Sequence, residues 1–135
     1  KNQGINLSIL LKGRATYIVG SEGIYAEDTG SSWAATPGSG DVLTGIVGAL
    51  VAHGAVAGRS VEESAAMAVR VHSRAALLAS LGASFGESAG KTWPADGARR
   101  FLSDTDTAGR GAPVTASEIS QSISAAIRDV RNGTL

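Results

Sequence analysis

The chain has 135 residues, which is enough for one domain with a modest core. Hydrophobic residues make up 43% and charged residues 18% of it, a balance typical of a globular rather than a disordered protein. Lys plus Arg and Asp plus Glu number 12 each and form no basic block, which argues against nucleic acid as the main partner. The absence of cysteine excludes disulfide and thiol chemistry, and the two distant histidines make a poor metal cluster.

The first part of the chain predicts β-strands. An apolar run over residues 7–11 predicts a buried strand, and the β-forming residues 15–19 predict a second one. A turn with a glycine at each end follows at residues 20–23, so we expect residues 24–26 to pair back as the arm of a hairpin.

The most apolar segment predicts a helix over residues 40–53. Apolar side chains occupy most of its circumference, so we expect burial on several sides. Gly45 and Gly48 inside the helix predict close packing on a neighbour, and Gly54 predicts its end. The apolar run is interrupted by Gly and His and is short for a bilayer, so we expect no membrane partner and a cytoplasmic location.

Ser60 and Glu63 have the spacing of a capping box, which predicts a second helix that runs to about residue 81 and stops at Gly82. Residues 83–112 have little periodicity and predict a long surface loop, with a short helix near residues 95–102.

Thr115 or Ser117 caps a last predicted helix, whose apolar stripe consists of Ile119, Ile123, Ile127 and Val130. Strands followed by helices indicate the later half of an α/β layered fold. The Gly- and Ala-rich helices could also serve a homo-oligomer interface. The chain starts at Lys1 with a strand-like run close behind, so we expect it to be the C-terminal part of a longer protein.

The sequence TPGSGDVLTG at residues 36–45 is the clearest functional motif. Glycine lets backbone amides approach a ligand closely, and a helix N-terminus offers unpaired N–H groups and partial positive charge. We therefore expect the amides of Gly38, Ser39, Gly40 and Asp41 to form an anion hole for phosphate. The Asp41 carboxylate beside it predicts a catalytic contact with a substrate hydroxyl; the alternative is a carboxylate that only stabilises the helix dipole.

Other polar residues are less specific. The turn at residues 12–16 could hold a nucleotide phosphate or ribose, but taken alone it is better interpreted as an ordinary tight turn with a solvated Lys12. His72 lies on the apolar face of its predicted helix and is interpreted as a core histidine rather than a ligand. His53, at a helix C-terminus, is interpreted as a partner of the helix dipole.

The segment LLKG at residues 10–13, the hydroxyl of Thr16 and the segment ATPGSGDVLTGI at residues 35–46 together resemble the ADP/ATP-dependent NAD(P)H-hydrate dehydratases of the ribokinase-like superfamily. The ending VTASEI at residues 114–119 resembles their C-terminal helix. The resemblance implies an α/β fold, the C-terminal half of a ribokinase-like layered domain. Because the family's domain is longer on its N-terminal side, it also implies that the N-terminal half is absent from residues 1–135.

The resemblance further implies a repair enzyme for hydrated NADH or NADPH. Such an enzyme phosphorylates the C6 hydroxyl from ADP, or from ATP in some relatives, and the ring nitrogen then drives phosphate out. By carry-over, Asp41 contacts the hydroxyl, and the adenine nucleotide is contacted by Lys12, Gly13, Arg14, Ala15, Thr16 and Gly40. A magnesium ion is usual in such kinase-like sites, but the sequence assigns it no ligand.

Two other functions stay open at this point. One is a small-molecule kinase of the vitamin-precursor type, in which Asp41 deprotonates a stable alcohol and the phosphate remains on it. The other is a non-catalytic nucleotide-binding or assembly fragment, whose partner would be the missing N-terminal half.

Overall fold

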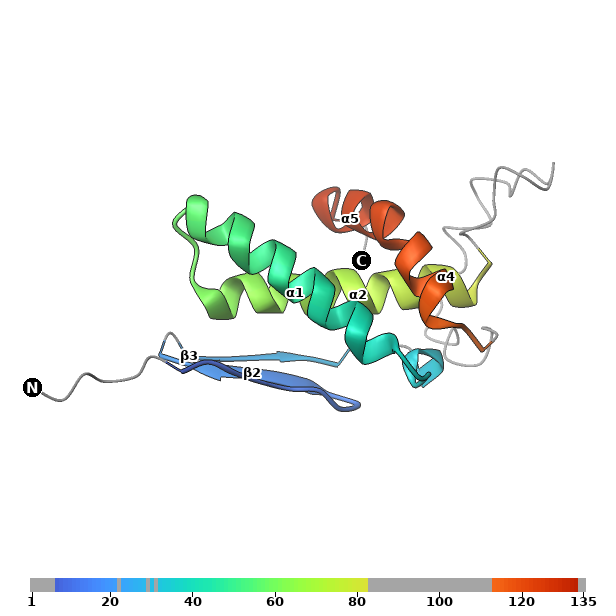
Figure 1. Cartoon of the computed structure of the whole chain (residues 1–135), viewed down its shortest axis with the longest axis horizontal. Coiled ribbons are helices and arrows are strands. Elements are labelled where there is room, and N and C mark those ends of the chain that lie inside the picture. Colours follow the sequence, from blue (N-terminus) through green and yellow to red (C-terminus); the bar gives the residue numbers. More distant parts are fainter. Residues whose placement is uncertain (1–6, 22, 29, 31, 83–112, 134–135) are drawn as a thin grey trace, which may run out of the picture.

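The computed structural model describes residues 7–21, 23–28, 30, 32–82 and 113–133. Figure 1 shows a small sheet on one side of the long helix α2, with α1 along α2 and the C-terminal helices on the other side. In chain order the elements are β1 (Ile9–Leu11), β2 (Thr16–Gly20), β3 (Gly23–Glu27), the 3₁₀ turn η1 (Ser32–Ala34), α1 (Ser39–Val56), α2 (Val61–Ser80), α4 (Ala116–Gln121) and α5 (Ile123–Arg131). The predicted order of strands and helices is therefore confirmed for the described residues. The loop expected over 83–112 and the short helix expected near 95–102 lie outside them.

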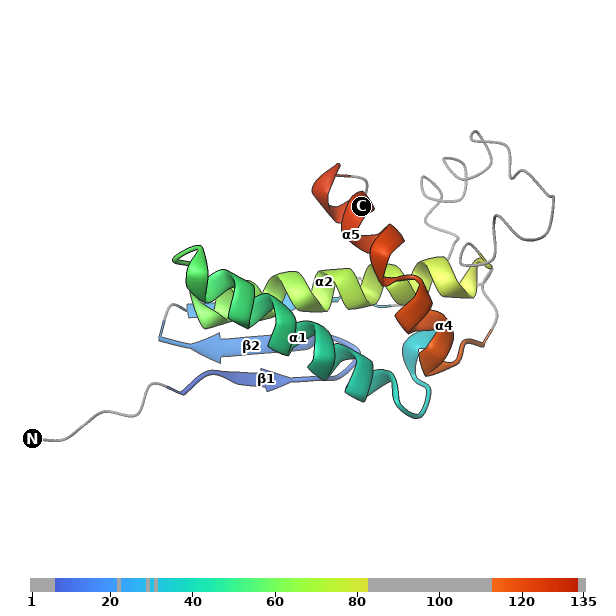
Figure 2. The ribbon, with the colours of Figure 1, turned by 45° about the horizontal axis from the view of Figure 1, so that its top comes forward.

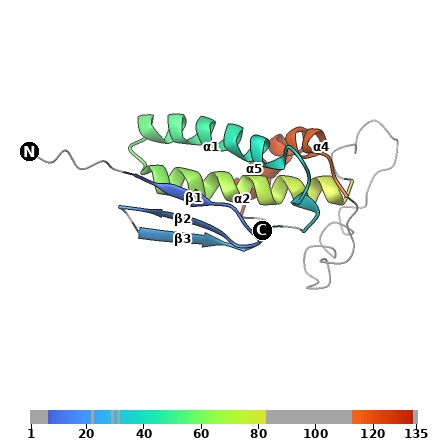
Figure 3. The same ribbon diagram turned by 60° about the horizontal axis from the view of Figure 1, so that its bottom comes forward.

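The three strands form one antiparallel sheet in the order β1-β2-β3 (Figure 3). Ile18 pairs with Tyr25, and its side chain points inward, where it is only 1% exposed. Ile9 pairs with Val19 and Leu11 with Tyr17, and these side chains share the opposite face. The expectation of a buried first strand is wrong, because Ile9 is 55% and Leu11 is 65% exposed on that face.

Helix α2 is the central element of the fold. It contacts the sheet, α1, α4 and α5, so side chains around most of its circumference are buried. Its buried residues are mostly small, and Ala68, Ala75 and Ala76 have no exposed surface. Small side chains allow the neighbouring helices to approach α2 closely, which explains why a chain with few aromatic residues still has a packed core.

Helix α1 packs against α2 along one side only. The expectation of burial on several sides is wrong, because its buried residues are confined to Ser39, Leu43, Ile46 and Gly54. The expectation of close packing at Gly45 and Gly48 is also wrong, since a Cβ atom there would meet nothing within 4 Å. By length and composition alone, this helix of 18 residues could cross a membrane, a test that helices of water-soluble proteins also pass.

The close approach of α1 to α2 occurs instead at Gly54. This glycine was expected to end the helix, but α1 continues to Val56, and it is Gly58, with φ of +71°, that follows the end. A Cβ atom on Gly54 would collide with the hydroxyl of Ser64 and lie 3.3 Å from the Ser64 Cβ. Because Gly54 has no side chain, the first turn of α2 can occupy the space where a side chain would lie.

The start of α2 is fixed by hydrogen bonds. The predicted cap is confirmed, since Ser60 Oγ accepts the Glu63 amide at 3.0 Å. Buried Glu62 accepts a hydrogen bond from the Ser8 hydroxyl at 2.9 Å, which ties α2 to the chain just before β1. Bonds from its own backbone amide and from Ser8 lower the pKa of Glu62. Gly20 leaves the room for this carboxylate, because a Cβ there would collide with it.

The C-terminal segment is anchored at both of its helices. Thr115, one of the two predicted caps, starts α4 with a complete capping box: the Thr115 hydroxyl accepts the Glu118 amide, and Glu118 accepts the Thr115 amide. The hydrogen bonds that the Thr115 amide and hydroxyl donate to the Glu118 carboxylate lower the pKa of Glu118. In α5, Asp129 accepts two hydrogen bonds from Arg74 of α2, at 2.6 and 2.8 Å. Buried Arg74 therefore has its counter-ion in place.

We predict that Gly54→Ala lowers the free energy of unfolding by about 1–3 kcal/mol, because the added methyl group forces α1 away from Ser64. Gly48→Ala, in the same helix but facing open space, should instead raise it by up to about 1 kcal/mol through helix propensity. Urea unfolding of the two variants beside the parent measures both effects. Equal effects of the two substitutions would contradict the packing described here.

Candidate active site

The motif at residues 36–45 forms a tight turn that runs into α1. Within this turn the Ser39 amide donates to the Thr36 carbonyl at 3.1 Å, and the Asp41 amide donates to the Gly38 carbonyl at 3.1 Å. Two of the four amides expected in the anion hole are therefore already engaged. Among the described residues, the amides of Gly38 and Gly40 have no partner, and they are the donors that the turn leaves for a ligand.

Gly38 is required by the turn itself. It has φ of +83°, a left-handed conformation that residues with side chains rarely adopt. A Cβ atom on it would also come within 3.0 Å of the Ala116 Cβ in α4. Gly38 thus serves the backbone shape and the docking of the C-terminal segment, which are structural reasons that the sequence did not reveal.

Gly40 differs from Gly38 because nothing in the described structure requires it. It lies in the first turn of a right-handed helix, and a Cβ atom there would meet nothing within 4 Å. Helices disfavour glycine by about 1 kcal/mol relative to alanine, so the fold alone would be better served by a side chain at this position. The next residue, Asp41, is exposed in the same turn. Open space, an unpaired amide and a carboxylate therefore occur together.

Ser39, which lies between the two glycines, faces inward and is only 1% exposed. Its side-chain oxygen and its carbonyl oxygen each lie 3.0 Å from Nε2 of His72 on α2. A carbonyl oxygen can only accept, so the contact with the Ser39 carbonyl is a hydrogen bond in the tautomer that carries its proton on Nε2, with His72 as the donor. His72 is confirmed as a core histidine, because it is 4% exposed. It also contacts the candidate site from α2, through Ser39.

Burial lowers the pKa of His72, and the positive charge of Lys12 lowers it further, while the hydrogen bond to the Ser39 backbone acts in the opposite direction. Lys12 belongs to the turn between β1 and β2. Figure 2 shows this turn at the same end of the molecule as the start of α1.

The residues of that turn differ in exposure. Lys12, Gly13 and Arg14 are exposed, Ala15 is half-buried and Thr16 is buried at the start of β2. A cation and exposed backbone are therefore available near the start of α1 from a second segment. Thr16 lies 6% exposed within the fold, a poorer position for contact with a ligand.

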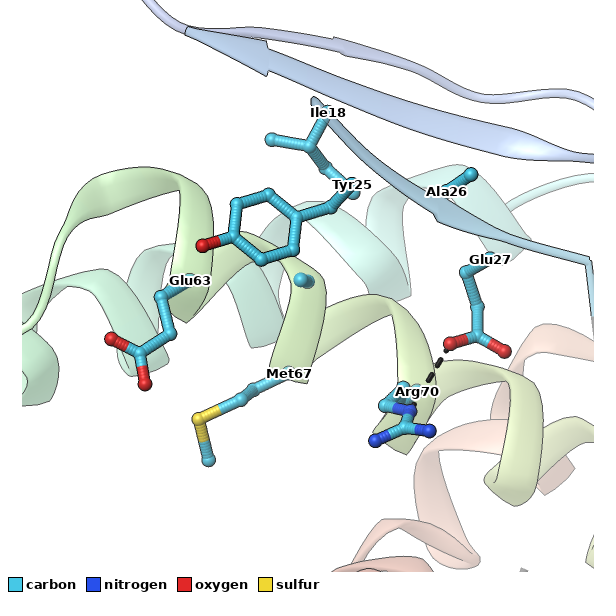
Figure 4. Close-up of a pocket in the computed structure, with 8 residues that line it drawn as sticks. Ile18, Tyr25, Ala26, Glu27, Glu63, Met67 and Arg70 are labelled. Atoms are coloured by element: carbon cyan, nitrogen blue, oxygen red, sulfur yellow. Dashed lines mark hydrogen bonds and ion pairs between the residues drawn. The ribbon is translucent and has the colours of Figure 1, made fainter. Parts of the chain in front are cut away.

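A pocket of about 270 Å³ lies elsewhere, between β3 and α2 (Figure 4). Tyr25 and Met67 line it, and at one end Glu27 pairs with Arg70 at 3.1 Å. None of the predicted site residues lines it. In the described residues, no group of three or more His, Cys, Asp or Glu side chains could hold a metal ion.

Comparison with known proteins shows the family to which the chain is similar. A family model described as NAD(P)H-hydrate dehydratase matches residues 2–91. The bifunctional NAD(P)H-hydrate repair enzyme Nnr of Mycobacterium leprae (strain TN) is 49% identical over 72 residues, which are 53% of this chain and 14% of the relative. Its namesake in Corynebacterium glutamicum is 54% identical over 44 residues, or 33% of this chain and 8% of that relative. The chain thus spans a small part of these relatives. No solved structure matches it.

The lowered pKa of His72 predicts acid-sensitive stability. The unfolded chain binds this proton near pH 6.5, and the folded chain binds it only at lower pH. The free energy of unfolding should therefore be at its full value above about pH 6.5 and fall below it, by at most about 1.4 kcal/mol per pH unit, until the folded pKa is passed. Urea unfolding from about pH 8 to about pH 5 measures the slope.

His72→Gln is the matched control, since it keeps a side-chain N–H donor and removes the titration. The carboxylates with lowered pKa, Glu62 and Glu118, titrate below the ordinary value of 4.5 and so act outside this window. The same slope in the parent and in His72→Gln would show that another group is responsible.

Proposed function

The chain belongs to the NAD(P)H-hydrate dehydratase family, and on that premise we propose that it takes part in the ADP- or ATP-dependent repair of hydrated NADH or NADPH. One observation carries the proposal to this site: Gly40 has an unpaired amide and open space around it, beside the exposed carboxylate of Asp41. The fold has no need of glycine there, whereas a bound phosphate does, because it must approach the backbone closely.

In this proposal each segment has one task. The amides of Gly38 and Gly40 donate to the phosphoryl oxygens, aided by the positive end of the α1 dipole. Lys12, Gly13 and Arg14, which are exposed in the turn after β1, bind the adenine nucleotide. Asp41 accepts the proton of the C6 hydroxyl and orients its oxygen toward the terminal phosphorus. Phosphoryl transfer depends mainly on such positioning.

The proposed chemistry has two steps. In the first, the C6 oxygen forms a bond to the terminal phosphorus of ADP, and the bond from that phosphorus to AMP breaks. In the second, the lone pair of the ring nitrogen expels phosphate as the C6–O bond breaks, and loss of a proton from C5 restores the double bond. The products are NAD(P)H, AMP and inorganic phosphate; with ATP as the donor, ADP replaces AMP.

Magnesium has no step assigned to it, because the described residues contain no cluster of ligands for it. A magnesium ion bound through nucleotide phosphates would supply charge neutralisation, and Asp41 is the nearest carboxylate in the motif that could contact it. A cytoplasmic location, where reduced nicotinamide nucleotides are used, belongs to the same proposal.

A non-catalytic role for residues 1–135 alone is favoured by one observation. The outer face of the sheet carries exposed Ile9, Leu11, Tyr17, Val19 and Ile24, and none of the described elements covers it (Figure 1). An apolar surface of this kind indicates contact with further polypeptide. On this alternative, residues 1–135 hold nucleotide but form a complete substrate pocket only with that polypeptide.

We predict that Asp41→Asn lowers turnover of hydrated NADH by about 10²–10⁴-fold and leaves nucleotide affinity within about tenfold, because the lost contact is to the substrate. Recovery of NADH absorbance and release of inorganic phosphate are measured in the longest polypeptide that the gene encodes. A stable phosphorylated product would instead support the small-molecule kinase. A large loss of nucleotide affinity would contradict the role given to Asp41.

We predict that Gly40→Ala separates stability from function. The free energy of unfolding should rise by up to about 1 kcal/mol, because the methyl group enters open space on a helix. Affinity for ADP should fall at least tenfold, because the same methyl group occupies the place of the phosphate. Gly45→Ala, also in open space on α1 but one turn further on, is the control and should keep its affinity. If ADP binds Gly40→Ala and the parent equally, the phosphate does not lie at Gly40.

A further inference from the structure

His72 makes the contact on which this inference rests. Its ring comes from the middle of α2, is 4% exposed, and has Nε2 at 3.0 Å from both oxygens of Ser39 in the first turn of α1. The two residues are 33 positions apart in sequence, and the bond joins the first turn of α1 to the middle of α2. Ser39 is also the residue between the two unpaired amides of the candidate site.

The geometry of one peptide unit links this bond to the ligand site. The carbonyl of Ser39 and the amide of Gly40 belong to the same planar group, and the described chain contains no cis peptide bond. In a trans peptide the C=O and the N–H point in opposite directions. When His72 Nε2–H holds the Ser39 carbonyl toward α2, the Gly40 N–H is directed away from α2. The place where a Cβ atom of Gly40 would lie is open.

We propose that His72 is a positioning residue of the phosphate-binding turn, which fixes the Ser39–Gly40 peptide so that the Gly40 amide is presented to the phosphoryl group. This inference deepens the proposed function and rests on it. It assigns the buried histidine a role without contact with nucleotide or substrate. Asp41 follows Gly40 in the first turn of α1. On this proposal, the bond from His72 to Ser39 therefore also orients Asp41.

The neighbours of His72 favour the neutral form that this role uses. Burial lowers its pKa, and Lys12 acts in the same direction from the turn between β1 and β2. Ser39 is the residue of α1 that faces it, through the two oxygens already named. A neutral ring has one N–H group. The bond to the Ser39 carbonyl requires that this N–H be at Nε2.

The first test reads the ring and the amide without substrate. In protein labelled with ¹⁵N, the imidazole shifts of His72 should report the neutral Nε2–H tautomer, and His72→Leu should move the Gly40 amide resonance. The Nδ1–H tautomer, or an unchanged Gly40 amide in His72→Leu, would overturn the inference. These signals do not depend on the reaction, so they keep their meaning if the proposed function fails.

The second test is kinetic and uses the longest polypeptide that the gene encodes. Per folded molecule, His72→Leu should lower kcat/KM by about 10²-fold with hydrated NADH and ADP. The reason is that a displaced Gly40 amide no longer donates its hydrogen bond to the phosphoryl group in the transition state. His72→Gln, with an amide nitrogen near the position of Nε2, should recover to within about tenfold of the parent. His53→Leu, which removes the exposed histidine at the other end of α1, is the matched control and should match the parent.

The pattern across the variants decides the outcome. A lower melting temperature for His72→Leu with an unchanged kcat/KM per folded molecule would make His72 merely structural and overturn the inference. If His72→Leu does not fold, the comparison of His72→Gln with the parent and the tautomer of the parent still test it. If the parent neither restores NADH absorbance nor releases phosphate from hydrated NADH, the proposed function is rejected, and the result on the ring is unaffected.

Discussion

The packing of α1 on α2 is the constraint on which the rest of the structure depends. At one end of α1 the absence of a side chain at Gly54 makes room for Ser64, and at the other end Ser39 is bonded to His72. Between these points small residues of α2 allow a close approach. Because the candidate site is the first turn of α1, its position is set by this packing and not by the turn alone.

The four consecutive residues of the candidate site differ in how much they contribute to the packing of the fold. Gly38 and Ser39 satisfy the fold: one has a left-handed backbone against Ala116, and the other is buried against His72. Gly40 and Asp41 lie open: a Cβ atom on Gly40 would meet nothing within 4 Å, and the exposed Asp41 carboxylate has no partner among the described residues. Residues that break a local preference without a structural return are expected at functional positions. Two residues held by the fold, followed by two that lie open, therefore fit a rigid ligand-binding turn.

The sequence predicted the parts that depend on local chemistry. Ser60 and Thr115 were identifiable as caps because their side-chain oxygens act within one turn, and the tight turn before α1 was identifiable from its glycines. It failed where the answer depended on distant residues. Three features were missed because they depend on how distant segments pack against each other. They are the continuation of α1 beyond Gly54, the exposed faces of α1 and β1, and the bond from His72 to Ser39. A histidine among alanines on an apolar helix face was the one local sign that a polar partner had to exist.

The uncovered outer face of the sheet is connected to the candidate site through the turn after β1. Helices cover the inner face through Ile18, while the outer face presents a row of apolar side chains at alternate positions on all three strands. Such a face raises the free energy of the chain in water until other apolar groups cover it. The turn after β1, which carries Lys12, is continuous with an exposed strand of this sheet. A polypeptide that covers the face would therefore also stabilise the segment proposed to bind nucleotide, so that assembly and ligand affinity would be coupled through the same strand.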